Sequence, residues 1–295
     1  MTVQIRSFNG KDLSNLVELL NEARRESYEF IPYGEEKFLS QIQEWNLKIL
    51  MAEKNGEVVG SIAYNNGQWG EEIEWLAVSE TSSRKFVENL LVRKIEKCVK
   101  GETIFTVIDA GSPKTDEWIE RGYKPEGGLY HMTAKLESLK PLPKVPEEVT
   151  LRSLKPEEEE EFIEAVNAGF GWERLKLGAI QRWKSRSPSF TEEWIHVAEL
   201  DNEIVSVVVS RPDEEYNKYF GGRRGYLGPA ATLPQCRGKN LAFALTLRAM
   251  NFLFKKGMDS VALYTSEKNI PSITLSRKLD FEISHHWKFM HKKLS

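Results

Sequence analysis

Cysteine is scarce in this chain, which has only Cys98 and Cys236, one in each half. Two distant cysteines form neither a disulfide framework nor a metal-binding cluster, and such usage is typical of a reducing compartment. The chain also lacks an apolar run of about 20 residues, the length that a membrane span needs. Its first residues, MTVQIRSF, contain no basic segment followed by an apolar one, so no signal peptide is expected. These absences predict a cytoplasmic protein without membrane contact.

The chain also lacks a large excess of positive or negative charge. The net charge is −3, which argues against nucleic acid or an anionic membrane as a partner. With 40% hydrophobic and 29% charged residues, the composition is that of a globular protein that can build a core. A length of 295 residues is more typical of two domains than of one.

An internal repeat supports two domains. Residues 3–7 (VQIRS) resemble residues 149–153 (VTLRS), an offset of 146. The same offset pairs Ala52-Glu53 with Ala198-Glu199, and residues 57–59 with 203–205. The ends match at a longer offset, which pairs residues 131–136 with 289–294 and places insertions in the second copy, in 214–225.

Three prolines fall within Lys140–Pro146, which predicts a semi-rigid linker between the copies. The predicted domains are therefore 1–138 and 148–295, joined by a proline-rich linker at 139–147. Each copy is expected to begin with an extended segment and a helix. A hairpin follows, turning at Asn55-Gly56 in the first copy and at Asp201-Asn202 in the second.

Each copy then continues with a strand, a long helix (about 84–99 and 239–256), a strand, a short helix and a closing pair of strands. The predicted fold class is α/β, with a mixed sheet flanked by helices.

Residues 227–257 carry the clearest chemical signal. A strand runs into a short loop that contains Gly238, and the loop opens a strongly apolar helix. A glycine before the first turn lets an anion approach the free N–H groups, where the helix dipole favours negative charge. Arg237 and Lys239 add positive charge beside it. Taken alone, this pattern is more often an ordinary turn than a phosphate site.

Two motifs here resemble those of the GNAT superfamily of N-acetyltransferases. The family signature Gln/Arg-x-x-Gly-x-Gly/Ala is similar to Gln235-Cys-Arg-Gly238-Lys-Asn240, which departs at Asn240. A second signature is matched by Asn269, Ser272, Leu275 and Phe281, with Ser276 in place of tyrosine and Asp280 in place of glycine. The resemblance covers residues 148–295 and implies two tandem GNAT-like acyl-CoA N-acyltransferase domains.

The resemblance implies acetyl-CoA, or a related acyl-CoA, as cofactor. Its pyrophosphate would lie on the backbone amides of the glycine loop, and its arm would contact Asn269. The loop residues that the resemblance assigns to the cofactor are Arg237, Gly238, Lys239, Asn240, Leu241 and Ala242. The Thr232 N–H would stabilise the oxyanion that develops on attack. Ser276, acting through a water, and Tyr264 are the candidates for a general acid.

The acceptor pocket is harder to place. By resemblance it would lie near Trp172, Glu173 and Tyr226, together with Phe170, Arg174 and Trp287. The candidates for a general base are Glu173, Tyr226, His285 and His286. Arg223 and Arg224 either bind an anionic acceptor or are solvated loop charges. Cys236 is not expected to be a nucleophile, because no partner residues accompany it.

The first copy resembles the family more faintly. Thr81, Arg84 and Phe86 fall at its three loop positions, no glycine remains, and Phe86 would crowd a phosphate. We expect a retained fold with a lost cofactor site, an architecture similar to that of mycothiol synthase, in which catalysis lies in the second half.

The expected function is transfer of an acetyl group to a primary amine of a small-molecule acceptor by direct attack, by a monomer or homodimer. The alternative is a non-catalytic acyl-CoA-binding sensor or interaction module. Aminoacyl transfer, as in peptidoglycan bridge formation, is disfavoured because no long helical arm is visible.

Overall fold

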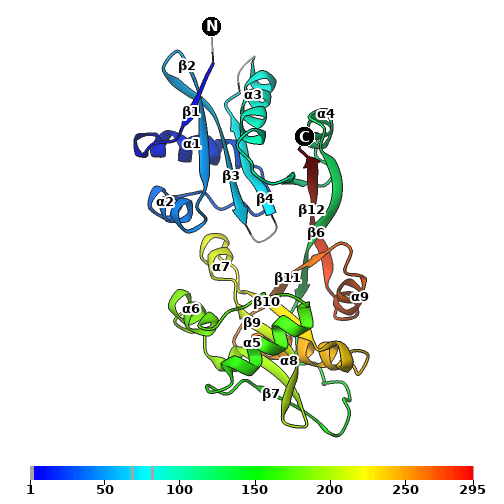
Figure 1. Ribbon diagram of the computed structural model, residues 1–295. Coiled ribbons are helices and arrows are strands. Elements are labelled where there is room, and N and C mark those ends of the chain that lie inside the picture. Colours follow the sequence, from blue (N-terminus) through cyan, green and yellow to red (C-terminus); the bar gives the residue numbers. More distant parts are fainter. Residues whose placement is uncertain (1–2, 68–69, 81–82, 295) are drawn as a thin grey trace. The chain divides into compact units, whose positions relative to one another are not determined.

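The computed structural model describes residues 3–67, 70–80 and 83–294, and the chain forms two compact units (Figure 1). The first unit contains Met1–Leu129 together with His285–Ser295, and the second contains Tyr130–Ser284. No helix among the described residues is long and apolar enough to cross a membrane.

The described residues of the first copy form six strands, four α-helices and one 3₁₀ turn. The strands are β1 (Gln4–Ser7), β2 (Lys48–Lys54), β3 (Glu57–Gly67), β4 (Gly70–Val78), β5 (Thr103–Asp109) and β6 (Lys124–Lys135). The helices are the 3₁₀ turn η1 (Gly10–Asp12) and α1 (Leu13–Arg24), α2 (Glu35–Glu44), α3 (Arg84–Glu96) and α4 (Lys114–Glu120).

The second copy repeats this order and adds one helix where an insertion was predicted. The strands are β7 (Val149–Ser153), β8 (Ile195–Leu200), β9 (Glu203–Pro212), β10 (Arg224–Thr232), β11 (Ser260–Ser266) and β12 (Glu282–Lys293). The helices are α5 (Glu159–Phe170), α6 (Ala179–Arg186), α7 (Glu214–Phe220), α8 (Leu241–Lys255) and α9 (Ile270–Lys278), with the 3₁₀ turns η2 (Glu192–Trp194) and η3 (Pro234–Cys236).

Each unit is a mixed sheet covered on both faces, which confirms the predicted fold class. In the second unit the strands follow the order β6-β11-β10-β9-β8-β7, and β10 and β11 are parallel. The seven residues Ile204–Ser210 of β9 are all buried, because α5 and α8 both pack against this strand. The two predicted hairpin turns are confirmed: Asn55 has φ 56° and Asp201 has φ 53°.

The closing strands correct the predicted architecture. Each copy ends in one strand, not in a pair, and that strand pairs in the unit of the other copy. Residues Trp287–Lys293 of β12 lie antiparallel to Thr103–Asp109 of β5 in the first unit. The end of β6 lies beside β11 in the second unit, where Leu136 N–H donates to the Asp259 carbonyl at 2.7 Å. Residues 136–148 contain no helix or strand, and the predicted linker at 139–147 falls within this segment.

A buried ion network occurs in both units at the repeat offset. In the second unit the Arg152 guanidinium donates two hydrogen bonds to Glu158, at 2.7 and 2.8 Å, and also pairs with Glu199. In the first unit Arg6 joins Asp12 and Glu53 in the same way. The network ties the first strand of each unit to the start of its first helix.

The network should make stability depend on pH. Burial alone would raise the pKa of Glu158, but hydrogen bonds from Arg152 and from the Lys155 N–H outweigh it and lower the pKa to about 2. Because this pKa lies below that of an unfolded glutamate, the stabilisation is complete above about pH 4.5 and is lost as the pH falls toward 2. We expect Glu158→Gln to cost about 2 kcal/mol in urea unfolding at pH 7.

The cost of Glu158→Gln should shrink as the pH falls to 3, because below about pH 4.5 the unfolded chain binds a proton at Glu158 that must be released on folding. The exposed Glu157→Gln is the matched control and should change little at either pH. A cost that is the same at pH 7 and pH 3 would contradict the assignment of this charge.

Candidate active site

The site lies where two parallel strands of the second unit part. β10 and β11 pair from Arg224↔Ser260 to Leu227↔Leu263, and their pairing ends there although β10 continues to Thr232. A register shift in the pairing of β10 with β9 falls between Leu227 and Ala230, at Gly228 and Pro229, as the sequence predicts. The bulge and the end of the pairing leave an edge of β10 that β11 does not cover, called here the β10–β11 opening.

The backbone of Thr232 faces this opening. Thr232 lies opposite Ser206, and the next pair is hydrogen-bonded, because Leu233 N–H donates to the Val205 carbonyl at 2.9 Å. Bonded and non-bonded pairs alternate along antiparallel strands, so the Thr232 N–H points away from β9. Its hydroxyl is held by Ser206, with 2.7 Å between the two oxygens. An N–H donor is thus fixed at the edge of β10 that faces the opening.

The loop after β10 ends in the first turn of α8. Gly238 has φ +82°, and a Cβ placed there would meet nothing within 4 Å, so one side of the loop is open. Gln235, Gly238, Lys239 and Asn240 are exposed, whereas Cys236 is buried, as expected of a residue that is not a nucleophile. The first N–H groups of α8, a 15-residue helix, have no partner within the helix and carry its positive dipole end. This surface can accept an anion.

Arg237 holds the loop against its neighbours. Its guanidinium donates to the Gly169 carbonyl at 2.8 Å and to the Thr232 carbonyl at 3.3 Å. At Gly169 an added Cβ would lie 2.8 Å from the Ala231 Cβ, so α5 packs directly on the end of β10. The glycine loop, α5 and Thr232 are therefore positioned together.

Two of the three departures from the family motifs have a backbone explanation. Asn240 has φ 65° and Asp280 also has φ 65°, the left-handed region in which glycine is most at ease. Asparagine and aspartate are the other residues that adopt this region most readily. The turns that the family makes with small residues are thus preserved.

The second motif forms the start of helix α9. Asn269 is the N-cap of α9, and its side-chain oxygen accepts the Ser272 N–H at 3.2 Å, which accounts for the spacing of these two residues. Ser276 is only 1% exposed. A buried hydroxyl could act only through a water, so the role of Ser276 stays a prediction.

Aromatic side chains line the start of the opening. The Tyr226 and Tyr264 rings are tilted with centroids 5.7 Å apart, and Tyr264 stacks on His131 of β6 at 4.7 Å. Arg211 lies opposite Tyr226 on β9, with its guanidinium carbon 4.6 Å from the Tyr226 ring centroid. Burial raises the pKa of Tyr226, although the charges of Arg211 and Arg174 act in the opposite direction. Tyr226 is therefore a protonated hydroxyl at neutral pH.

Tyr226, Tyr264 and the glycine loop were identified from the sequence, but Arg211 and His131 were not. Arg211 could have been found as a cation at the end of an apolar run, on a strand that the hairpin places beside β10. His131 comes from the first copy, so nothing in the second copy points to it.

The loop after α5 brings in Trp172 and Arg174. The Arg174 guanidinium carbon lies 4.7 Å from the Phe170 ring centroid and 5.5 Å from that of Trp172. Asn167 fixes this loop, because its side-chain oxygen accepts the N–H groups of Arg174 and Leu175 at 2.7 and 2.9 Å. Glu173 instead pairs with Lys176 at 3.2 Å, and both side chains are largely exposed.

Other predicted acceptor residues lie elsewhere. His285 and Trp287 belong to the first unit, because β12 pairs with β5 there. A role of Trp287 in the acceptor pocket therefore stays a prediction. Arg224 is 5% exposed and pairs with Asp213 at 2.8 Å, so it is neither an acceptor ligand nor a solvated charge. Arg223 pairs with Asp259 at 3.2 Å on the surface.

The segment before α3 in the first unit contains no glycine. α3 begins at Arg84, whose guanidinium pairs with the buried Glu88 at 3.0 Å. A carboxylate in the first turns of the helix disfavours a second anion there. Phe86 is 58% exposed on the same helix, and Thr81 lies outside the described residues.

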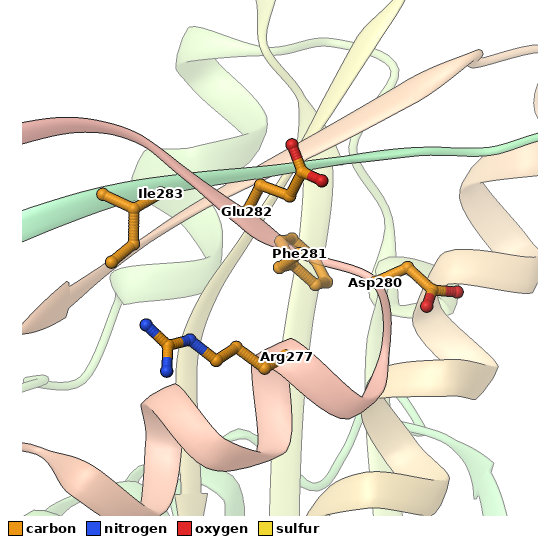
Figure 2. A pocket seen from close by; sticks show the side chains of 5 residues that line it. All are labelled: Arg277, Asp280, Phe281, Glu282 and Ile283. Carbon is orange, nitrogen blue, oxygen red and sulfur yellow. The ribbon is translucent and has the colours of Figure 1, made fainter.

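A hollow of about 430 Å³ lies where α9 passes into β12, and Figure 2 shows the side chains that line it. It is lined by Arg277, Asp280, Phe281, Glu282 and Ile283, whose charged groups point in different directions. None of these residues comes from β10, β11 or the glycine loop, so the hollow is separate from the site.

Comparison with known proteins agrees with this geometry. Residues 151–281 match the acetyltransferase (GNAT) family. Mycothiol acetyltransferase of Saccharomonospora viridis is 32% identical over 149 residues, which are 48% of this chain and 48% of that protein. The chain spans about half the length of the curated relatives it matches first.

Solved structures extend the likeness to the whole chain. A GCN5-related N-acetyltransferase from Sphaerobacter thermophilus has a TM-score of 0.71 at 17% identity, over 99% of this chain and 96% of that one. A tandem GNAT protein from the clavulanic acid biosynthesis pathway has a TM-score of 0.68 at 15% identity, over 100% and 99%. At these identities the likeness concerns the fold alone. Residues 151–281 thus match the acetyltransferase (GNAT) family, and the fold of the whole chain resembles that of a tandem GNAT protein.

Proposed function

We propose that this protein transfers an acetyl group from acetyl-CoA to a primary amine of a small-molecule acceptor, at a single site in the second unit. The observation that carries the proposal is the β10–β11 opening, with the Thr232 N–H directed into it and the glycine loop of α8 beyond it. The relatives named mycothiol acetyltransferase support acetyl transfer and do not identify the acceptor here.

The residues present fit an acyl-CoA. The open side of Gly238 and the free N–H groups at Asn240, Leu241 and Ala242 form an anion site for the pyrophosphate. Arg237 and Lys239 place two positive charges beside it. The uncovered edge of β10 offers backbone groups to the extended arm, as in strand addition. The side-chain amide group of Asn269 remains directed to solvent for the same arm, because only its oxygen caps α9.

The proposed reaction requires few catalytic groups from the chain. Acetyl-CoA, when bound, supplies the thioester; a bond forms between the amine nitrogen and the acetyl carbon, the carbon–sulfur bond breaks, and the amine proton ends on sulfur. The Thr232 N–H donates to the oxygen on which negative charge develops. The edge of β10 holds this donor in place before the substrate binds. Tyr264, 44% exposed beside the opening, is the candidate donor to sulfur.

Calorimetry with acetyl-CoA, followed by CoA release across a panel of amines, tests the proposal. We expect one equivalent to bind and at least one amine to be acetylated. One equivalent without turnover on any amine would favour the alternative, a non-catalytic acyl-CoA sensor. A second equivalent would contradict the assignment of the first unit as inactive.

A further inference from the structure

Two arginines, Arg174 and Arg211, lie beside the proposed acceptor side of the opening, and neither has a carboxylate partner among the described residues. Arg174 and Arg211 make stacking contacts with Phe170, Trp172 and Tyr226. Among the residues that the structure describes, no carboxylate pairs with either guanidinium. Arg211 is exposed and Arg174 is half-buried, so both retain free donors.

The two guanidinium groups belong to elements that pack against β10, the strand of Tyr226. Arg211 lies on the neighbouring strand, with its guanidinium carbon 4.6 Å from the Tyr226 ring centroid, and Arg174 lies in the loop after α5, which contacts β10. The positive charges of both lower the pKa of Tyr226, against the effect of burial. Tyr226 and Tyr264 lie on one face of the sheet, because Tyr226 pairs with Ala262 in the parallel ladder. The charges therefore flank the place where strands β10 and β11 part.

The fold itself does not require these cations. In the first unit Asn21 binds the backbone of Tyr33 as Asn167 binds that of Leu175, so Pro32 stands where Arg174 stands. The cross-strand pair Asn65↔Glu72 corresponds to Arg211↔Tyr226. The same scaffold thus forms without either arginine, and a positive charge at both positions is a property of the second unit.

Building on the proposed function, we infer that the acceptor is an amine that also carries a carboxylate, and that Arg174 and Arg211 bind this carboxylate. Guanidinium groups bind carboxylates through paired hydrogen bonds, and Tyr226 can donate a third. Their stacking on aromatic rings and the Asn167 contacts hold the donors in place before the ligand arrives. Binding the acceptor by its carboxylate would leave its amine free to reach the opening.

Calorimetry on the full chain with CoA present, so that no acetyl group is consumed, tests this inference. Each of the common amino acids is titrated alongside its α-carboxamide. We expect at least one amino acid to bind roughly tenfold to a hundredfold more tightly than its amide, because a charged hydrogen-bond pair is lost in the amide. Arg211→Gln and Arg174→Gln should each remove most of that difference, and Arg211→Lys should retain part of it.

Arg93→Gln, an exposed arginine of α3, is the matched control and should leave the preference unchanged. If no amino acid binds more tightly than its amide, or if the preference survives both substitutions, the inference is overturned. Ethanolamine and its phosphate ester form a further pair, and a preference confined to that pair would overturn the carboxylate assignment. Arg211→Gln should bind acetyl-CoA as tightly as the unaltered protein does. If the unaltered protein does not bind acetyl-CoA, that result counts against the proposed function and not against the carboxylate assignment.

Discussion

Replacing Gly238 by aspartate is expected to weaken acetyl-CoA binding by at least about a hundredfold. At φ +82° the new side chain would project from the open side of the loop, toward the N–H groups that begin α8. The carboxylate would take those donors itself and would stand where the pyrophosphate is expected. Like charges in such a contact cost several kcal/mol, so we expect no measurable binding in calorimetry at micromolar acetyl-CoA.

The other end of the same helix supplies the control. Gly257 has φ +86°, and a Cβ there would also meet nothing within 4 Å, so Gly257→Asp imposes the same backbone strain away from the loop. Both variants should lose a similar amount of thermal stability, about 1 kcal/mol, and only Gly238→Asp should lose acetyl-CoA. Undiminished affinity in Gly238→Asp would remove the phosphate site from this loop.

The features that the sequence predicts well are local. The hairpin turn at Asp201 depends on residues that accept positive φ, and the loop at Gly238 depends on a glycine between an apolar strand and an apolar helix. Such patterns involve only a few neighbouring residues, so they can be interpreted without knowledge of the rest of the fold. The insertion was also predictable, since α7 lies where the repeat loses its offset.

The pairing of each closing strand in the unit of the other copy depends on long-range contacts, so no local sequence pattern indicates it. β6 and β12 descend from the same element of the repeat, so each has an alternating pattern that suits the edge of either unit. The choice between them depends on chain connectivity and on contacts such as the pairing of Trp287 with Asp109. For this reason the sequence does not indicate that Trp287 and His285 lie in the first unit and His131 in the second.

Departures from a family motif are easiest to interpret once the backbone is known. Asn240 and Asp280 depart from the family motifs, and their φ angles of 65° place both in the left-handed region that glycine also adopts. Ser276 is buried, so its action through a water stays a prediction. The proposed mechanism uses Tyr264 on β11 as the acid, together with the backbone donor at Thr232.

Replacing Thr232 by proline is expected to lower kcat for acetyl transfer by about 10²- to 10³-fold, because it removes the backbone donor assigned to the oxyanion. The substitution is unusually clean at this position. Thr232 is in a non-bonded pair with Ser206, so its N–H makes no hydrogen bond to β9 that proline would break. Since the glycine loop is untouched, the affinity for acetyl-CoA should fall much less than kcat.

Two neighbouring substitutions separate catalysis from structure. Thr232→Ala removes the hydroxyl that contacts Ser206 and keeps the N–H, so kcat should stay within a few-fold of the unaltered protein. Ala231→Pro removes an N–H that faces Val207 in a bonded pair, so it should lower the melting temperature instead. If Thr232→Pro folds, binds acetyl-CoA and still turns over at the normal rate, the oxyanion donor lies elsewhere. The parted strands would then serve only to admit the cofactor's arm, and catalysis in this unit would rest on side chains such as Tyr264.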